Sequence, residues 1–151
     1  MKKWLLTLII FPLFLMGCDP DVKPGFSQKQ LHGHWILTKI DGKDVSISEP
    51  RSVPSMAIDS DLKVAGFSGC NRFFGQVELA KGYKLRVVAM GATKMACIQE
   101  DEAHVEKVMT KSLQKWNNVA LENQILTLTS ELHILTFLPT DHSPEEDSEQ
   151  Q

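Results

Sequence analysis

The chain is 151 residues long, 42% hydrophobic and 23% charged, with a formal net charge of −3 at neutral pH. This length suits one domain with short extensions, because single domains most often span about 100–150 residues. Nucleic-acid binders need a basic face, so an acidic chain of this kind predicts no nucleic-acid partner.

The first 17 residues are typical of a bacterial export signal. Two lysines precede an uncharged run over residues 4–15, which is too short to cross about 30 Å of hydrocarbon as a stable helix. The run ends in LMGC at residues 15–18, which resembles the lipobox of bacterial lipoproteins. The resemblance implies cleavage before Cys18 and makes residues 1–17 a lipoprotein signal peptide. An ordinary cleaved signal and an uncleaved anchor are the alternatives.

Cys18 is the residue on which this resemblance places lipidation. Fatty acids such as palmitate on its sulfur and amino group would stabilise membrane attachment by about 0.8 kcal/mol per buried methylene. We therefore expect a lipid-anchored membrane protein of the cell envelope that faces the periplasm. Asp19 resembles the inner-membrane retention signal of enterobacterial lipoproteins, but Pro20 is not its usual companion. The choice between inner and outer membrane stays open, and loss of two lysines with the signal lowers the formal charge from −3 to −5.

The mature chain divides into three parts. Residues 18–30 are polar and contain two prolines, which predicts a polar tether. Residues 31–139 form one domain that can bury about two-thirds of its unfolded surface, and we expect it to be a monomer. Residues 140–151 hold five acidic groups and no lysine or arginine, which predicts a disordered acidic tail.

Most of the domain has the apolar alternation of β-strands, as in Tyr83, Leu85 and Val87. The Asp41-Gly42 pair is a strong turn signal, and the breaks between strands are short, which favours antiparallel hairpins over parallel crossovers. The predicted strands are residues 31–40, 45–47, 56–59, 64–68, 75–79, 83–89, 119–122, 125–130 and 132–138.

Residues 67–75, FSGCNRFFG, predict a tight reversal that leads into a strand. Gly69 and Asn71 tolerate positive φ, Gly75 closes the motif, and the two phenylalanines place one ring on each side of the strand. Arg72 is expected to be held by an acceptor from the helix or by a carbonyl, with an anion contact as the functional alternative.

Cys70 and Cys97 remain as a pair once Cys18 carries lipid. In an oxidising compartment they predict a disulfide, which closes a loop of 28 residues and stabilises the fold by about 3.5 kcal/mol on the chain-entropy model. A nucleophile and a metal ligand are the alternatives. The first lacks a base in the sequence nearby, and the second lacks further cysteines or histidines at short spacing. We predict no catalytic residue, metal or cofactor.

Residues 99–116 have a helical period. Val105, Val108, Met109, Leu113 and Trp116 fall on one stripe. Acidic residues open the segment and lysines close it, which complements the helix dipole at both ends. The pattern predicts one amphipathic helix whose apolar stripe faces the core.

The remaining polar candidates carry weaker signals. His32 and His34 lie two residues apart and would share a strand face, so a weak metal pair and a solvent-facing position are both open. Asp59 and Asp61 flank a predicted turn. His104 and His133 have no sequence neighbour that indicates a site.

Three stretches in the same order resemble the META domain family of HslJ-like bacterial lipoproteins. They are LxGxWxL at residues 31–37 followed by the Asp-Gly turn, residues 66–75 with the core GCNR, and TKMAC at residues 93–97. The resemblance covers residues 31–138. It implies a mainly β (α+β) fold, a strongly curved antiparallel sheet or partly open lipocalin-like barrel with one packed helix, and it implies no catalytic residues.

Two functional classes follow from these observations. The first is a non-enzymatic, lipid-anchored module for protein interaction or stress tolerance, with an unknown envelope protein as partner. The second is a carrier or sensor of a hydrophobic ligand, which needs a cavity of about 300 Å³ or more. The large apolar side chains suffice to fill a small barrel, which favours the first class. An enzyme is least favoured, because no catalytic constellation is present.

Overall fold

The structure, a computed structural model, describes residues 26–46 and 53–140. The predicted signal peptide, most of the predicted tether and nearly all of the predicted acidic tail lie outside the described residues. Cys18 and Asp19 are among the residues outside. The elements are α1 (Gln28–Leu31), β1 (Gly33–Ile40), β2 (Lys43–Asp44), β3 (Ser55–Ile58), β4 (Lys63–Phe67), β5 (Arg72–Ala80), β6 (Lys84–Ala92), α2 (Glu100–Leu113), β7 (Asn117–Glu122), β8 (Ile125–Thr129) and β9 (Ile134–Pro139).

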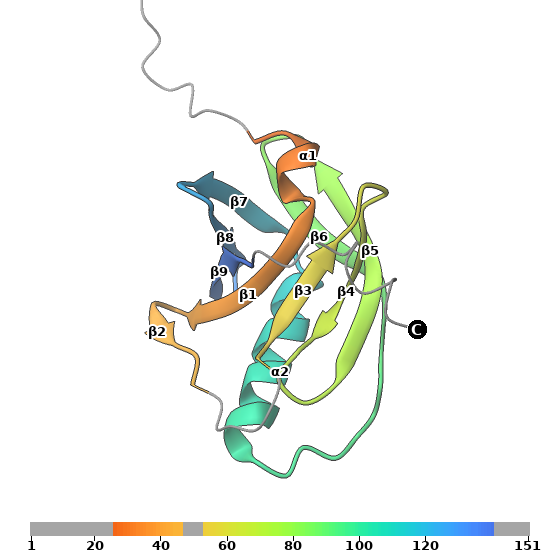
Figure 1. Cartoon of the computed structure of the whole chain (residues 1–151), viewed down its shortest axis with the longest axis vertical. Coiled ribbons are helices and arrows are strands. Elements are labelled where there is room, and N and C mark those ends of the chain that lie inside the picture. Colours follow the sequence, from red (N-terminus) through yellow and green to blue (C-terminus); the bar gives the residue numbers. More distant parts are fainter. Residues whose placement is uncertain (1–25, 47–52, 141–151) are drawn as a thin grey trace, which may run out of the picture.

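Eight antiparallel strands close into a barrel, with α2 packed against it (Figure 1). The strand order is β2-β1-β3-β4-β5-β6-β7-β8-β9, and β1 also pairs with β9, which closes the barrel. Strand β2 is a short extra strand on β1. The predicted mainly β, lipocalin-like barrel with one packed helix is therefore confirmed.

Alternate side chains of the strands fill the barrel interior. Met56 and Ile58 of β3, and Leu126 and Leu128 of β8, are each at most 2% exposed, as the period of two along a strand requires. The other buried apolar residues that pack with them are Leu31, Trp35, Leu37, Ile40, Val64, Phe73, Val77, Leu85, Val87, Val105, Val108, Met109, Leu113, Leu135 and Phe137. The interior is thus a packed core in which the predicted stripe of α2 takes part. Its last predicted member was wrong, because Trp116 lies beyond the end of α2 and is 37% exposed.

Strands β6 and β7 share the shortest pairing in the closed barrel. Only Lys84 with Asn118 and Leu85 with Asn117 are in register. Helix α2 connects these two strands, and the fully buried Asn117 joins its last turn to the sheet. The Asn117 side-chain amide donates to the carbonyl oxygens of Ser112 at 2.8 Å and of Lys115 at 2.7 Å. A side chain, rather than a strand ladder, therefore holds the end of α2 against the barrel.

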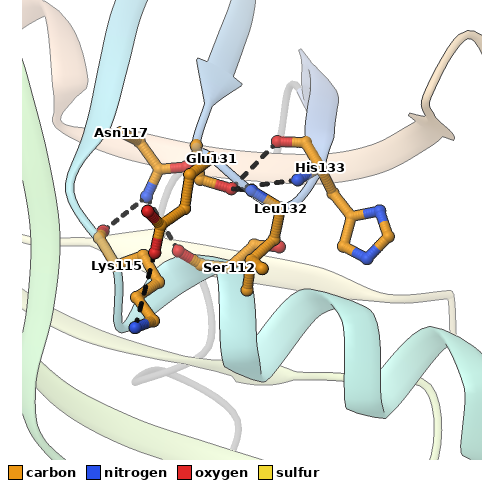
Figure 2. Close-up of polar contacts among 7 residues, drawn as sticks. Ser112, Lys115, Asn117, Glu131, Leu132 and His133 are labelled. Atoms are coloured by element: carbon orange, nitrogen blue, oxygen red, sulfur yellow. Dashed lines mark hydrogen bonds and ion pairs between the residues drawn. The ribbon is translucent and has the colours of Figure 1, made fainter.

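The turn between β8 and β9 lies beside this junction (Figure 2). The Lys115 ammonium and the Glu131 carboxylate form an ion pair at 3.5 Å. The Ser130 hydroxyl oxygen accepts the backbone N–H groups of Leu132 and His133 at 3.2 and 3.1 Å. This local capping lets the chain reverse within a few residues.

The observed elements differ from the predicted ones mainly at their ends. The strand predicted from residue 31 begins at Gly33, because Leu31 ends α1, where its carbonyl oxygen accepts the Trp35 indole N–H at 2.9 Å. The folded domain thus includes residues assigned to the tether. The strand predicted over residues 45–47 is instead β2, two residues earlier, and Ile47 lies outside the described residues. Strand β5 begins at Arg72, earlier than predicted.

Candidate functional site

A disulfide joins the turn before β5 to the segment that leads into α2. The Cys70 and Cys97 sulfurs are bonded at 2.11 Å, with their Cα atoms 5.7 Å apart. The predicted cross-link is therefore present. In this state neither sulfur is a thiolate, and a thiolate is what a nucleophile or a metal ligand requires.

Asn71 forms a polar clamp beside this disulfide. Its side chain is 3% exposed. Its backbone N–H donates to Glu106 Oε2 at 2.8 Å, and its side-chain Nδ2 donates to Glu106 Oε2 at 3.0 Å and Oε1 at 3.1 Å. The Ser68 hydroxyl donates to the Asn71 carbonyl oxygen at 2.9 Å. The turn is thereby fixed to α2, on which Glu106 lies.

The other side of the Asn71 amide holds the segment before α2. Asn71 Oδ1 accepts the Met95 backbone N–H at 2.7 Å and the Thr93 hydroxyl at 2.8 Å. Nδ2 also donates to the Met95 carbonyl oxygen at 3.2 Å. One asparagine side chain therefore connects three parts of the chain, and each of its polar atoms has a partner.

The remaining residues of the predicted turn motif have backbone roles. Gly69 has φ +110°, and a Cβ there would lie 3.3 Å from Val105 on α2, so the turn needs glycine for both conformation and space. A Cβ on Gly75 would lie 3.0 Å from the Val88 carbonyl oxygen. The Arg72 side chain is exposed and makes no hydrogen bond or ion pair with a described residue. The acceptor expected for Arg72, from the helix or a carbonyl, is therefore not found among the described residues.

Three groups near the disulfide lie at distances that suit a metal site. One ligand atom each of Cys70, Cys97 and Glu106 falls within 4.8 Å of the others. The Asn71 side-chain nitrogen already occupies the space between them, 3.6 Å from the Cys70 sulfur and 3.9 Å from the Cys97 sulfur. With both sulfurs bonded to each other, this arrangement is a structural clamp.

The histidines do not form a cluster within the described residues. His32 and His34 both line an open hollow of about 410 Å³ at the barrel end, together with Trp35 and Gln124. No third metal-ligating side chain joins the two histidines in the described ranges. The predicted pair therefore lies along one surface without completing a metal site.

His133, which the sequence did not single out, contacts the turn between β1 and β2. Its Nδ1 lies 2.7 Å from Asp41 Oδ2, and the Ile134 N–H donates to Asp41 Oδ1 at 2.8 Å. The pKa of the Asp41 carboxyl lies below its ordinary value. The hydrogen bond from the Ile134 N–H is the largest cause, and the hydrogen bond with the His133 ring is the second. The Asp41-Gly42 turn motif was the only sequence feature that pointed to this contact. It predicts the turn, but it does not predict that Asp41 contacts a histidine 92 residues away.

An apolar face lies on the outside of strands β3 to β6. It consists of Ala57, Ala65, Phe74 and Gly91, which are cross-strand neighbours in consecutive pairs. Phe74 is 62% exposed, whereas Phe73 is 2% exposed, so the predicted placement of one ring on each side is confirmed. A mostly apolar, open hollow of about 390 Å³ lies beside Phe74 and above the two alanines. We call these four residues the outer apolar face.

Comparisons with known proteins agree on the fold. The family model of the META domain matches residues 28–142. One protein solved by NMR is 23% identical, with a TM-score of 0.65, covering 76% of this chain and 96% of its own. Another, from Burkholderia xenovorans, is 21% identical, with a TM-score of 0.62, covering 94% of this chain and 100% of its own. No curated protein matches the chain.

Neither described helix is long and apolar enough to cross a bilayer.

Proposed function

This chain belongs to the META domain family, and on that premise we propose a lipid-anchored cell-envelope protein that binds another protein through the outside of its barrel. The anchor is acylated Cys18, and the domain faces the periplasm. Its activity is binding rather than catalysis, in a role that contributes to stress tolerance. The lipobox-like sequence before Cys18 supports the anchor, and the packing of the barrel supports the mode of binding.

The filled barrel interior is the observation that carries this proposal. A carrier of hydrophobic ligands needs an enclosed apolar space of about 300 Å³ or more. Trp35, Phe73 and Phe137 are at most 4% exposed and pack with the stripe of α2 across the interior. The hollows near Trp35 and near Phe74 are open to solvent. Recognition is therefore better suited to the outer surface than to the interior.

The outer apolar face is the recognition surface that we assign. An exposed phenylalanine beside two alanines and a glycine forms a contiguous apolar area, and contiguous exposed apolar areas are typical of interaction sites. Asp59 and Lys63 line the same hollow and supply charges at its edge. An apolar centre with a polar rim is the usual anatomy of a protein interface.

Photocrosslinking in living cells tests this surface. A photoreactive amino acid at position 65 or 74 should give a discrete crosslinked product, whereas one at the exposed position 111 of α2 should give none. The Phe74→Ser substitution should remove the product formed from position 65 and should lower the free energy of unfolding by only about 1 kcal/mol, because the ring is mostly exposed. Equal crosslinking from positions 65 and 111, or a product from position 65 that persists with Phe74→Ser, contradicts the assigned surface.

The anchor and the carrier alternative have separate tests. Intact-mass analysis of protein purified from native membranes should show acyl chains on Cys18, and an unmodified amino terminus contradicts the anchor. Native mass spectrometry after gentle extraction should show a domain free of bound lipid. A stoichiometric co-purifying lipid overturns the preference for the outer surface and supports the carrier function.

A further inference from the structure

We infer that the barrel end carrying α1 and the turn between β5 and β6 rests on the bilayer surface, an inference that depends on the lipid anchor proposed above. The described chain enters the domain at this end, where α1 lies beside the end of β5 (Figure 1). Cys18 and Phe26 are eight residues apart, a separation of less than about 30 Å even in a fully extended chain. The α1 end is therefore the part of the domain that the anchor holds nearest to the headgroups.

An aromatic pair occupies this end. The ring centroids of Phe26 and Tyr83 are 5.5 Å apart. Phe26 packs against the barrel core, while Tyr83, the only tyrosine of the chain, is 48% exposed in the turn between β5 and β6. Tyrosine is enriched where membrane meets water, because its ring is apolar and its hydroxyl is polar. The pair presents such a ring on a rigid support.

Three exposed lysines surround this pair. Lys81 precedes Tyr83 in the turn, Lys84 follows it as the first residue of β6, and Lys29 lies on α1. None of the three forms an ion pair with a described residue. Lysine stems lie along apolar surface while their ammonium groups reach outward, and anionic headgroups attract such groups within a Debye length. The chemistry of this end therefore fits an anionic lipid surface.

Three acidic residues also lie at this end, as many as the lysines named above, and the carboxylate of one of them accepts backbone N–H groups of its own turn. Glu122 ends β7, and Asp59 and Asp61 lie in the turn between β3 and β4. The Asp59 carboxylate accepts the backbone N–H groups of Asp61 and Lys63 at 2.9 and 2.8 Å. By contrast, the start of α2 with its three acidic residues lies at the far end of the barrel from α1 (Figure 1). This orientation keeps that acidic cluster away from an anionic bilayer.

Lysine footprinting of the acylated protein tests the orientation. Protein purified from native membranes is reconstituted on the outside of phosphatidylethanolamine–phosphatidylglycerol vesicles, on phosphatidylcholine vesicles and in detergent. It is then acetylated with a water-soluble reagent and analysed by mass spectrometry. On the anionic vesicles, acetylation of Lys29, Lys81 and Lys84 should slow by about tenfold or more relative to detergent. Acetylation of the exposed Lys94 and Lys107 should not change.

Charge reversal supplies the matched control. The Lys81→Glu/Lys84→Glu variant should lose the anionic-lipid dependence of Lys29 acetylation, whereas Lys107→Glu/Lys111→Glu should keep it. Both variants change exposed residues, so both should fold, and Lys107→Glu/Lys111→Glu should lose about 1 kcal/mol of stability because Lys111 complements the dipole of α2. If the protein floats with the vesicles but all its lysines are acetylated at the same rate, the inferred surface is wrong and the proposed anchor is still supported. Failure to float overturns the anchor, and the inferred surface with it.

Discussion

Asn71 and Glu106, 35 residues apart in the chain, form a three-contact clamp in which a backbone N–H and a side-chain amide donate to one carboxylate. This clamp fixes the turn before β5 to α2. Because Asn71 also holds Met95, the segment that carries Cys97 depends on the same side chain. The clamp and the disulfide are therefore expected to stabilise the same junction.

The Asn71→Asp substitution should weaken the clamp without changing its shape. It retains the acceptor for Met95 but places a second carboxylate about 3 Å from Glu106, where the wild type has a donor. We expect a loss of about 2–4 kcal/mol in the free energy of unfolding at pH 7. Two adjacent carboxylates repel each other, which raises the pKa of the pair in the folded variant. The loss of stability should therefore shrink as the pH falls from 7 towards 4, because the pair then takes up a proton and shares it.

Urea unfolding from pH 7 to pH 4 measures this effect. The Asn118→Asp substitution is the matched control, because Asn118 is exposed on β7, and it should change the unfolding free energy by less than about 0.5 kcal/mol. If Asn71→Asp is as stable as Asn118→Asp at pH 7, the clamp does not contribute to stability.

Removal of the disulfide should lower stability while leaving the barrel folded. The Cys70→Ala/Cys97→Ala variant removes a link between residues 27 positions apart and should lose about 3.5 kcal/mol on the chain-entropy model, while the Asn71 clamp keeps the turn in place in the folded state. Hydrogen exchange should show loss of protection at Met95 and at the start of α2, but not in β8 and β9. An unchanged unfolding midpoint, or exchange spread evenly over the strands, contradicts this assignment.

Two glycines should respond differently to alanine. A Cβ on Gly66 would clash with the backbone carbonyl of Ser55 and lie 2.9 Å from the Met56 Cα, and backbone atoms in a sheet cannot yield. Gly66→Ala should cost about 2–3 kcal/mol or more. The three atoms nearest to a Cβ on Gly91 all belong to the exposed Phe74 ring, which can rotate into solvent, so Gly91→Ala should cost less than about 1 kcal/mol.

Guanidinium unfolding of both glycine variants measures the difference. The Phe74→Ala/Gly91→Ala double variant is the control, because it removes the ring that lies nearest to a Cβ at Gly91. It should be no less stable than Phe74→Ala alone. Equal losses for the two single variants would show that the strands adjust more than the cross-strand geometry implies.

Asp41 should make stability depend on pH. Because the pKa of its carboxyl is lower in the folded state, chiefly through the Ile134 N–H, its contribution is fully present above the unfolded-state pKa of about 4. That contribution is lost as the pH falls through the lower folded-state pKa. Asp41→Asn should therefore differ from the wild type at pH 6 and approach it at pH 2–3.

Unfolding midpoints at a series of pH values test this prediction. Asparagine tolerates the positive φ of this turn position, which is +51°, so the substitution isolates the charge. Asp44→Asn, whose side chain is 84% exposed, should follow the wild-type pH profile. A constant difference between Asp41→Asn and wild type across the pH range would exclude a titrating Asp41.

The local features of this fold could be predicted from the sequence. Alternation over β8 and the stripe of Val105, Val108 and Leu113 report which side of an element is buried, and that depends only on the period of the element. The cysteine pair followed from counting thiols in an oxidising compartment. Element ends were less accurate, as at Leu31, because its buried side chain suits a helix and a strand equally well.

Only the tertiary structure decided which distant groups meet. Closure of β1 on β9, the contact of His133 with Asp41, and the role of Glu106 as acceptor for Asn71 each join segments that are far apart in the chain. Periodicity and turn propensity act over a few residues, so they specify burial and reversal. The identity of a hydrogen-bond partner depends on which elements become neighbours when the barrel closes, and no short-range pattern records that.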